Sequence, residues 1–305
     1  MNPSLPHFTI SPSVLEAVSQ QHYPAGTLYV VPTPIGNTGD ISLRALYLLG
    51  IADAVACEDT RNTAQLLNRY GISKPLLAAH QHNEREVTAT LQKRLEAGER
   101  VALVSDAGTP GVSDPGARIV DGLREAGMRI TALPGASAAI TALSASGFLA
   151  PEFHFVGFLP SKSSQRETVL QALAPQAASL IFYEAPHRIT DTVEAMHQVF
   201  GARRIVFARE ISKLFEEIHR CHLTEAGQWL QADAHRQKGE YVLIVEGQSA
   251  DQQQDDLEAR RILAVLLEEC SVKQAASLAA KLTGQKKNAL YPLALSMKDN
   301  EAESG

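Results

Sequence analysis

The chain has 305 residues, 45% of them hydrophobic, and a net charge of −6 at pH 7. This length can bury a sizeable core and predicts about two domains with a small appendage, while the charge argues against a protein that is basic throughout and binds nucleic acid over its whole surface. Cys57, Cys221 and Cys270 lie too far apart in the sequence for the paired ligands of a structural zinc site, so we expect no metal.

The first 25 residues contain no lysine or arginine and no continuous apolar segment. They are therefore unlike a signal peptide or a membrane anchor, and their prolines and serines predict a loose extension. The longest stretch poor in charge, residues 131–151, consists largely of small side chains and predicts a buried helix rather than a membrane span. We expect a soluble, cytoplasmic protein.

Short β-rich runs then alternate with helical runs in residues 26–135. The expected strands are residues 27–31, 54–57, 76–79, 101–104 and 129–133, and the expected helices are residues 41–49, 62–70, 84–96 and 117–125. An alternation of strand and helix requires crossover connections, which join parallel strands. This part of the chain is therefore predicted to be an α/β domain with a mostly parallel sheet.

A second α/β domain is expected at residues 136–247, after a helix of small residues near 136–146. Its expected strands are residues 153–158, 180–183, 204–208, 218–223 and 241–246. Because fewer helices separate these strands, the sheet should be mixed, with residues 217–223 and 240–246 as neighbours. The polar stretch QSADQQQDD at 248–256 predicts a linker.

The region beyond the linker, residues 257–295, predicts helices, two of them short and separated by Thr283 and Gly284, followed by a tail at 296–305. Between residues 271 and 291 the chain has four lysines and no acidic residue: Lys273, Lys281, Lys286 and Lys287. This outline resembles a helix-turn-helix that binds nucleic acid. A helical pair that caps the protein or forms a dimer is an equally good interpretation.

A glycine-rich loop, SDAGTPGVSDPG at 105–116, directly follows the strand expected at 101–104. Glycine allows positive φ and lets the backbone approach a ligand closely, and ligands bind at the carboxyl ends of strands in α/β sheets. The glycine spacing is not that of a dinucleotide-binding loop, and no Gly-Lys-Ser/Thr follows. A ligand other than a phosphate chain is therefore favoured.

Further loops are expected beside it, because parallel strands end at the same edge of a sheet. They are PTPIGN at 32–37, EDTR at 58–61 and LPGASA at 133–138. Two more motifs belong to strands of the second domain, YEAPHR at 183–188 and GEYVLIVEG at 239–247. Each of them also has an ordinary structural interpretation. Asp59 and Thr60 suit the start of a helix, and Arg61 could simply pair with Glu58.

Taken together and in this order, these motifs resemble the tetrapyrrole-methylase superfamily. Within it the similarity is greatest to the branch that methylates the ribose 2′-hydroxyl of a decoding-centre cytidine in 16S rRNA, and it extends from Gly26 to Leu295. The resemblance implies an α/β, two-domain (class III) methyltransferase fold with a helical appendage, S-adenosylmethionine bound in the cleft between the domains, and a homodimer. Two other functions stay open: methylation of a small tetrapyrrole, and RNA binding without catalysis during ribosome assembly.

The resemblance also implies site residues. Those expected to contact the methyl donor are Asp106, Ala107, Gly108, Ser137, Ala138, Tyr183 and Ala208. A ribose hydroxyl is a poor nucleophile, so a base would help, and the candidates are Glu58, Asp59, His80 and His187, with no choice made among them. The residues expected to contact RNA are Arg61, Lys162, Arg166, Arg188 and the four lysines of the C-terminal helices.

Overall fold

A computed structural model describes residues 10–80, 83–285 and 287–303. The first half of the chain forms a five-stranded sheet whose strands are all parallel, in the order β3-β2-β4-β1-β5. The strands are β1 (Thr27–Val30), β2 (Ala54–Cys57), β3 (Leu76–Ala78), β4 (Arg100–Leu103) and β5 (Arg129–Ala132). The expected α/β alternation and parallel sheet are confirmed.

Both faces of this sheet are covered, which explains the continuous apolar runs in β1 and β2. On one face Tyr29, Val55 and Ala102 pack against α2 (Leu43–Ile51) and α3 (Thr60–Arg69). On the other face Leu28 and Val101, with their neighbours, pack against α4 (Glu84–Glu96) and α5 (Ala117–Glu125). Because these four helices cover the faces of the sheet, the carboxyl ends of its strands are lined by loops instead.

The expected loose extension is wrong for its second half. Residues 12–19 form α1 (Pro12–Ser19), which packs against α2, and Tyr23 is buried between the rings of Tyr29 and Tyr47. The aromatic ring of Tyr23 buries enough apolar area to fix this segment. Residues 1–9 lie outside the described part of the chain.

The second sheet is mixed, as expected, in the order β6-β7-β10-β8-β9. Its strands are β6 (Phe153–Phe158), β7 (Ser179–Glu184), β8 (Arg204–Arg209), β9 (Glu217–His222) and β10 (Tyr241–Val245). β6 and β7 are parallel, and the other pairs are antiparallel.

The expected pairing of residues 217–223 with 240–246 is wrong, because β10 inserts between β7 and β8. All five residues of β10 are buried, a pattern that needs a partner strand on each side and a cover on each face. β9, with alternating exposure, pairs with β8 at the edge instead.

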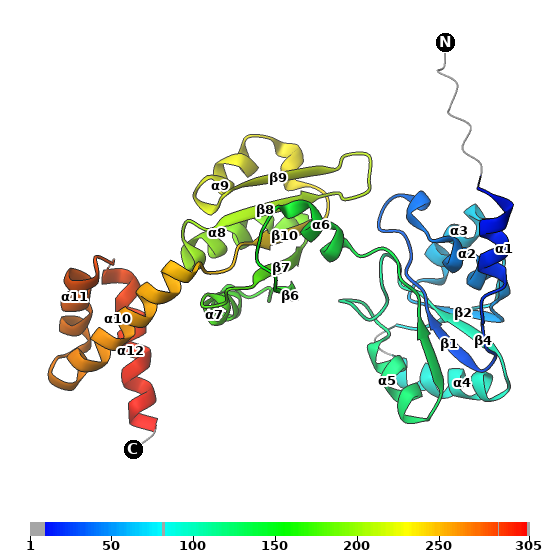
Figure 1. Cartoon of the computed structure of the whole chain (residues 1–305), viewed down its shortest axis with the longest axis horizontal. Coiled ribbons are helices and arrows are strands. Elements are labelled where there is room, and N and C mark those ends of the chain that lie inside the picture. The colour runs from blue at the N-terminus through cyan, green and yellow to red at the C-terminus, as the bar shows by residue number, and fades with distance from the viewer. Residues whose placement is uncertain (1–9, 81–82, 286, 304–305) are drawn as a thin grey trace, which may run out of the picture.

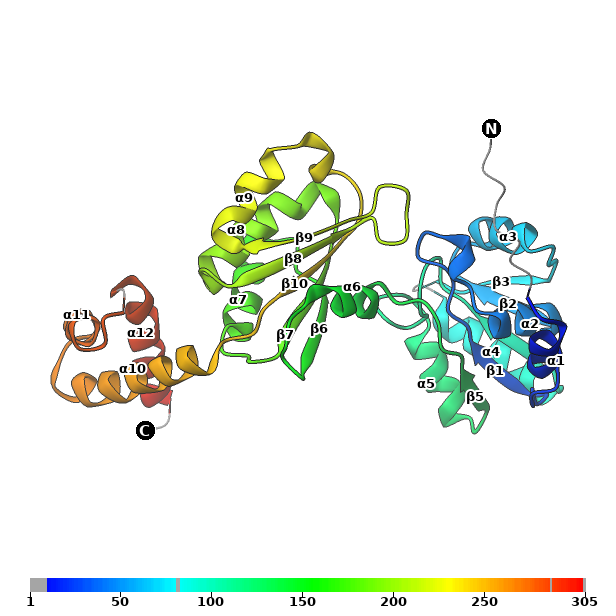
Figure 2. The ribbon, with the colours of Figure 1, turned by 45° about the horizontal axis from the view of Figure 1, so that its top comes forward.

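Helices cover both faces of the second sheet as well. α7 (Ser163–Leu173), α8 (Ile189–Phe200) and α9 (Leu223–Gln231) pack on one face. α6 (Ala138–Ser146) packs on the other face through Ala139 and Ala142, which contact the layer formed by Ile181, Val206 and Ile244. α6 lies between the two sheets in both views (Figures 1 and 2), so the loop before it belongs to the region where they meet.

The C-terminal helices α10 (Ala250–Glu269), α11 (Val272–Thr283) and α12 (Lys287–Glu303) have an apolar core of their own. The expected linker at 248–256 is mostly wrong: α10 begins at Ala250, and the glutamines of this stretch are good helix formers. The expected break at Gly284 is confirmed, since Gly284 ends α11 with a φ of 73°. Among the described helices, none is both long enough and apolar enough to span a membrane.

Candidate functional site

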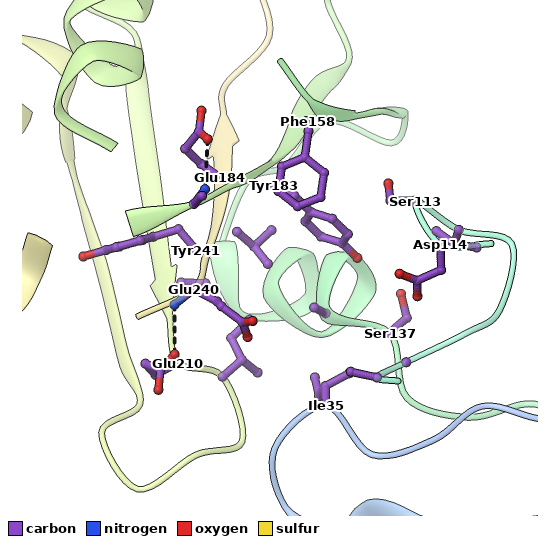
Figure 3. Close-up of a pocket in the computed structure, with 18 of the residues that line it drawn as sticks. Ile35, Ser113, Asp114, Ser137, Phe158, Tyr183, Glu184, Glu210, Glu240 and Tyr241 are labelled. Carbon is purple, nitrogen blue, oxygen red and sulfur yellow. Dashed lines mark hydrogen bonds between the residues drawn. The ribbon is translucent and has the colours of Figure 1, made fainter. Parts of the chain in front are cut away.

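A cavity of about 320 Å³ lies where the two sheets meet (Figure 3). The first domain contributes the glycine-rich loop after β4, the loop after β1 and the loop before α6. The second domain contributes the end of β7, the end of β8 with the loop after it, and the start of β10. The cavity is thus built from the carboxyl edge of the parallel sheet, where ligands bind in α/β proteins, and from one end of the mixed sheet.

The glycine-rich loop is held to the loop after β1 by a short antiparallel bridge. The N–H of Thr33 donates to the oxygen of Gly108 at 2.9 Å, and the N–H of Gly108 donates back at 3.0 Å. Gly108 has a φ of 79°, and a Cβ there would lie 3.4 Å from Ile35. Glycine is favoured at this position because a side chain would strain the backbone at this positive φ.

Six of the seven residues expected to contact a methyl donor line this cavity. They are Ala107, Gly108, Ser137, Ala138, Tyr183 and Ala208. The seventh, Asp106, does not line it. Its carboxylate accepts hydrogen bonds from the N–H of Asp59 at 3.2 Å and from the Asn62 side chain at 2.9 Å, so it holds the start of α3 against the loop.

Tyr183 forms an aromatic wall of the cavity. Its ring meets Phe155 and Phe158 edge-on, with centroids 5.1 and 5.6 Å apart, and its oxygen accepts a hydrogen bond from the N–H of Ala139 at 3.3 Å. Burial raises the pKa of the Tyr183 hydroxyl, which therefore stays neutral at physiological pH. This wall offers a flat apolar face of the kind on which a nucleoside base stacks.

Four carboxylates that were not among the predicted site residues also line the cavity: Asp114, Glu184, Glu210 and Glu240. Burial, followed by the negative charge of Glu58, raises the pKa of Asp114 to about 6, although the Ser105 hydroxyl acts in the opposite direction. Asp114 could have been suspected from its place in the second half of the glycine-rich loop, SDPG at 113–116. The sequence alone, however, cannot show which of the two aspartates in this loop faces a cavity.

The only lysine that lines the cavity, among the residues described, is neutralised. Lys213 Nζ lies 2.9 Å from Glu210 Oε1 and 2.7 Å from Glu240 Oε2. Burial alone would lower the pKa of Lys213, but the hydrogen bonds to Glu240 and Glu210 outweigh it and raise the pKa. Burial also opposes ionisation of Glu210, whose pKa is nevertheless lowered by the Glu240 N–H and by Lys213. The cavity therefore favours a cation over an anion.

None of the four candidate bases lines the cavity in the described structure. Glu58 lies close to Asp114 and Asp106, and its pKa is raised first by burial and then by the charge of Asp106. Asp59 caps α3 by accepting the Arg61 N–H at 2.7 Å, and hydrogen bonds from Arg61 lower its pKa. His80 and His187 are both exposed.

The residues expected to contact RNA divide into two groups. Arg61 and Lys162 are exposed, although Arg61 forms an ion pair with Asp59 at 3.3 Å. Arg188 points inward instead: its Nη2 donates to the carbonyl oxygens of Leu159 and Pro160, and its Nε lies 3.3 Å from the buried Glu184.

Arg166 is also unsuited to contact RNA, because it is only 6% exposed on the inner face of α7. The predictions for Arg188 and Arg166 are therefore not supported by their geometry. Lys273, Lys281 and Lys287 are exposed on α11 and α12, whereas Lys286 lies outside the described residues.

A parallel sheet joined to a mixed sheet around such a cavity is the fold of known methyltransferases. A cobalt precorrin-4 methyltransferase aligns with a TM-score of 0.55 and 17% identity, covering 74% of this chain and 98% of that one. The methyltransferase CobJ aligns with a TM-score of 0.55 and 21% identity, covering 73% and 95%. A uroporphyrin-III C-methyl transferase from Thermus thermophilus, solved with S-adenosyl homocysteine, aligns with a TM-score of 0.50 and 19% identity, covering 72% of this chain and 97% of that one. These likenesses show that the chain has the two-domain fold of these methyltransferases.

The family model for tetrapyrrole (corrin/porphyrin) methylases matches residues 27–227, and a model for the RsmI C-terminal HTH domain matches residues 253–298. A curated relative from Escherichia coli O157:H7, named ribosomal RNA small subunit methyltransferase I, is 49% identical over 88% of this chain and 95% of its own length. The Pseudomonas aeruginosa protein of that name is 48% identical over 89% of this chain and 97% of its own length. The chain belongs to the tetrapyrrole methylase family and, within it, to the ribosomal RNA small subunit methyltransferase I group.

Proposed function

We propose that this protein transfers a methyl group from S-adenosylmethionine to the 2′-oxygen of a decoding-centre cytidine in 16S rRNA. The observation that carries the proposal is the cavity between the two sheets, lined by neutral backbone, one aromatic wall and carboxylates, in a chain 49% identical to a ribosomal RNA small subunit methyltransferase. The match of residues 253–298 to a helix-turn-helix domain supports an RNA substrate over a small tetrapyrrole.

The cavity fits the proposed methyl donor in size and charge. Its volume of about 320 Å³ is within the range of small-molecule sites. S-adenosylmethionine carries a sulfonium and an ammonium group, and both are compatible with a wall that contains Asp114, Glu210 and Glu240 and whose one described lysine is paired. A phosphate-bearing ligand would meet these carboxylates without a compensating cation.

In this proposal the backbone of Ala107 and Gly108 and the residues Ser137 and Ala138 bind the donor from the first domain, and Tyr183 and Ala208 bind it from the second. Asp106 acts indirectly, by fixing the loop against α3. The bound donor supplies a methyl group activated by the positive sulfur. The protein's residues then have to align the acceptor oxygen with that methyl group and exclude water.

The RNA is proposed to be bound mainly outside the cavity. Exposed lysines on α11 and α12 attract phosphates without regard to sequence, and Lys162 and Arg61 lie on the two domains that form the cavity. The target nucleotide has to leave its stack to reach the cavity. We further propose that the protein acts as a homodimer on the assembled small subunit, which is a cytoplasmic substrate.

A labelling experiment tests the proposal. The protein is incubated with S-adenosylmethionine carrying a labelled methyl group and with small subunits that lack the modification, and the label is mapped to base or ribose. Label on one cytidine 2′-oxygen is the expected result, and subunits that already carry the modification are the control. Label on a tetrapyrrole but not on RNA would refute the proposal, and binding to subunits without any transfer would indicate an assembly factor.

A further inference from the structure

The second aspartate of the glycine-rich loop, Asp114, is held in place by an unusual backbone. The preceding residue, Ser113, has a φ of 60°, which is uncommon for a residue with a side chain. The loop is closed behind Asp114 by a hydrogen bond from the N–H of Gly111 to the oxygen of Pro115 at 3.3 Å. Strained positions of this kind persist where the surroundings require them and are frequent in active sites.

The end of the loop is anchored by a buried carboxylate. The N–H of Gly116 donates to Glu84 Oε1 at 3.0 Å, and Glu84 is only 7% exposed. Asp114 therefore sits between two fixed points, and its carboxylate points into the cavity, toward Ser137 and the hydroxyl end of Tyr183 (Figure 3).

Asp114 differs from the other carboxylates that line the cavity. Glu210 and Glu240 are paired with Lys213. Glu184 accepts hydrogen bonds from the Ala185 N–H at 2.9 Å and from the Thr192 hydroxyl at 2.5 Å, and it lies beside Arg188. Within the described part of the chain, Asp114 is therefore the cavity carboxylate that forms no ion pair with a lysine or arginine.

The groups that face Asp114 come from several elements. Glu58 follows β2 and Asp106 follows β4, and both contribute negative charge. The nearby Ser105 hydroxyl acts to lower the pKa of Asp114, and Tyr183 from β7 is neutral. Two negative neighbours and partial burial make protonation of this carboxylate easier than that of an exposed aspartate.

We propose that Asp114 is the general base that accepts the proton of the acceptor hydroxyl. This inference rests on the proposed function. The 2′-oxygen forms a bond to the methyl carbon while the carbon–sulfur bond breaks and its electron pair stays on sulfur, leaving a neutral thioether. The hydroxyl proton passes to a carboxylate oxygen of Asp114 and later to water, so charge and atoms balance.

The first test compares Asp114→Asn with Asp121→Asn, which removes an exposed carboxylate from α5 in the same domain. We expect D114N to slow single-turnover methylation of small subunits by roughly 10²-fold to 10⁴-fold, the usual contribution of a general base. We expect D121N to transfer at the wild-type rate. D121N should bind S-adenosylhomocysteine with wild-type affinity by calorimetry, D114N should still bind it, and both variants should unfold at the wild-type temperature.

The second test does not depend on turnover. In the ligand-free protein labelled with ¹³C-aspartate, one carboxyl signal should titrate with a pKa of about 6 and should be missing in D114N. The wild-type rate should rise through the same pH range, and this rise should be absent from the residual activity of D114N.

The two proposals fail in different ways. If the wild type transfers no methyl group to small subunits, the proposed function is wrong. If the wild type does transfer it and D114N matches its rate, only the role of Asp114 is wrong. A D114N variant that loses affinity for S-adenosylhomocysteine would make Asp114 a donor-binding residue instead of a base.

Discussion

Glu58 and Asp114 are neighbours with like charge, and only Asp114 lines the cavity. A negative neighbour disfavours ionisation, so the charge of Glu58 raises the pKa of Asp114. Removing that charge lowers the pKa of Asp114, and the ionised form then extends to lower pH. The pair therefore offers a way to test the assignment through the pH dependence of the rate.

We predict that Glu58→Gln shifts the rise of kcat/KM toward lower pH, because Asp114 ionises more readily without Glu58. The measurement is the rate of subunit methylation between pH 5 and pH 8. Glu125→Gln, at the exposed end of α5, is the control and should leave the profile in place. Loss of activity by E58Q at every pH would identify Glu58 itself as the base.

Gly108 gives a prediction about stability at the same scale. Gly108→Ala places a side chain at a φ of 79°, which costs roughly 1–2 kcal/mol, and brings its Cβ into contact with Ile35 in the cavity wall. We expect a lower free energy of unfolding and weaker binding of S-adenosylhomocysteine, measured by denaturant titration and calorimetry. Gly227→Ala, in α9 with open space around the added carbon, is the matched control and should stabilise the protein by about 1 kcal/mol.

At the scale of elements, local sequence patterns predicted the positions of the strands and most helices, but they did not predict which strands pair with each other. The apolar runs predicted all ten strands that the structure describes, and Gly284 predicted the turn between α11 and α12. The place of β10 between β7 and β8 could not be predicted in this way, because it depends on pairs of residues far apart in the sequence, such as Tyr241 and Glu184. The polar start of α10 was mistaken for a linker, since exposed helices and linkers share such residues.

Helices α11 and α12 carry the lysines that the proposal assigns to phosphate binding. We predict that the combined change of Lys273, Lys281 and Lys287 to Gln weakens binding to small subunits. The salt dependence should also become shallower, by about 1 in the log–log slope for each phosphate that is no longer neutralised. Lys93→Gln, on the exposed face of α4, is the control. An unchanged salt slope would favour the alternative of a capping helical pair.

At the scale of the whole molecule, the C-terminal helices are separate from the site. Their apolar core is built from α10, α11 and α12, and none of their described residues lines the cavity. In Figures 1 and 2 they lie at the end of the second domain away from the first. The lysines proposed to bind RNA are therefore separate in the structure from the cavity proposed to bind the methyl donor.

Deleting residues 250–305 should thus weaken binding to small subunits while leaving the affinity for S-adenosylhomocysteine close to that of the full chain. Light scattering should show the same dimer in both forms if the proposed homodimer is made by the two α/β domains. A monomeric deletion variant would mean that the C-terminal helices build the dimer.

Strand runs, turns and motifs are local properties, so the amino-acid sequence was sufficient to predict the order of the elements, the parallel first sheet and the loops that carry Gly108, Ser137 and Tyr183. Folding was needed to establish that Asp106 faces α3 while Asp114 faces the cavity, that Arg188 is engaged inside the second domain, and that Lys213 is paired. The physical reason is that burial and the distance to other charges set what a polar side chain can do. Both quantities depend on residues that the chain brings together only when it folds.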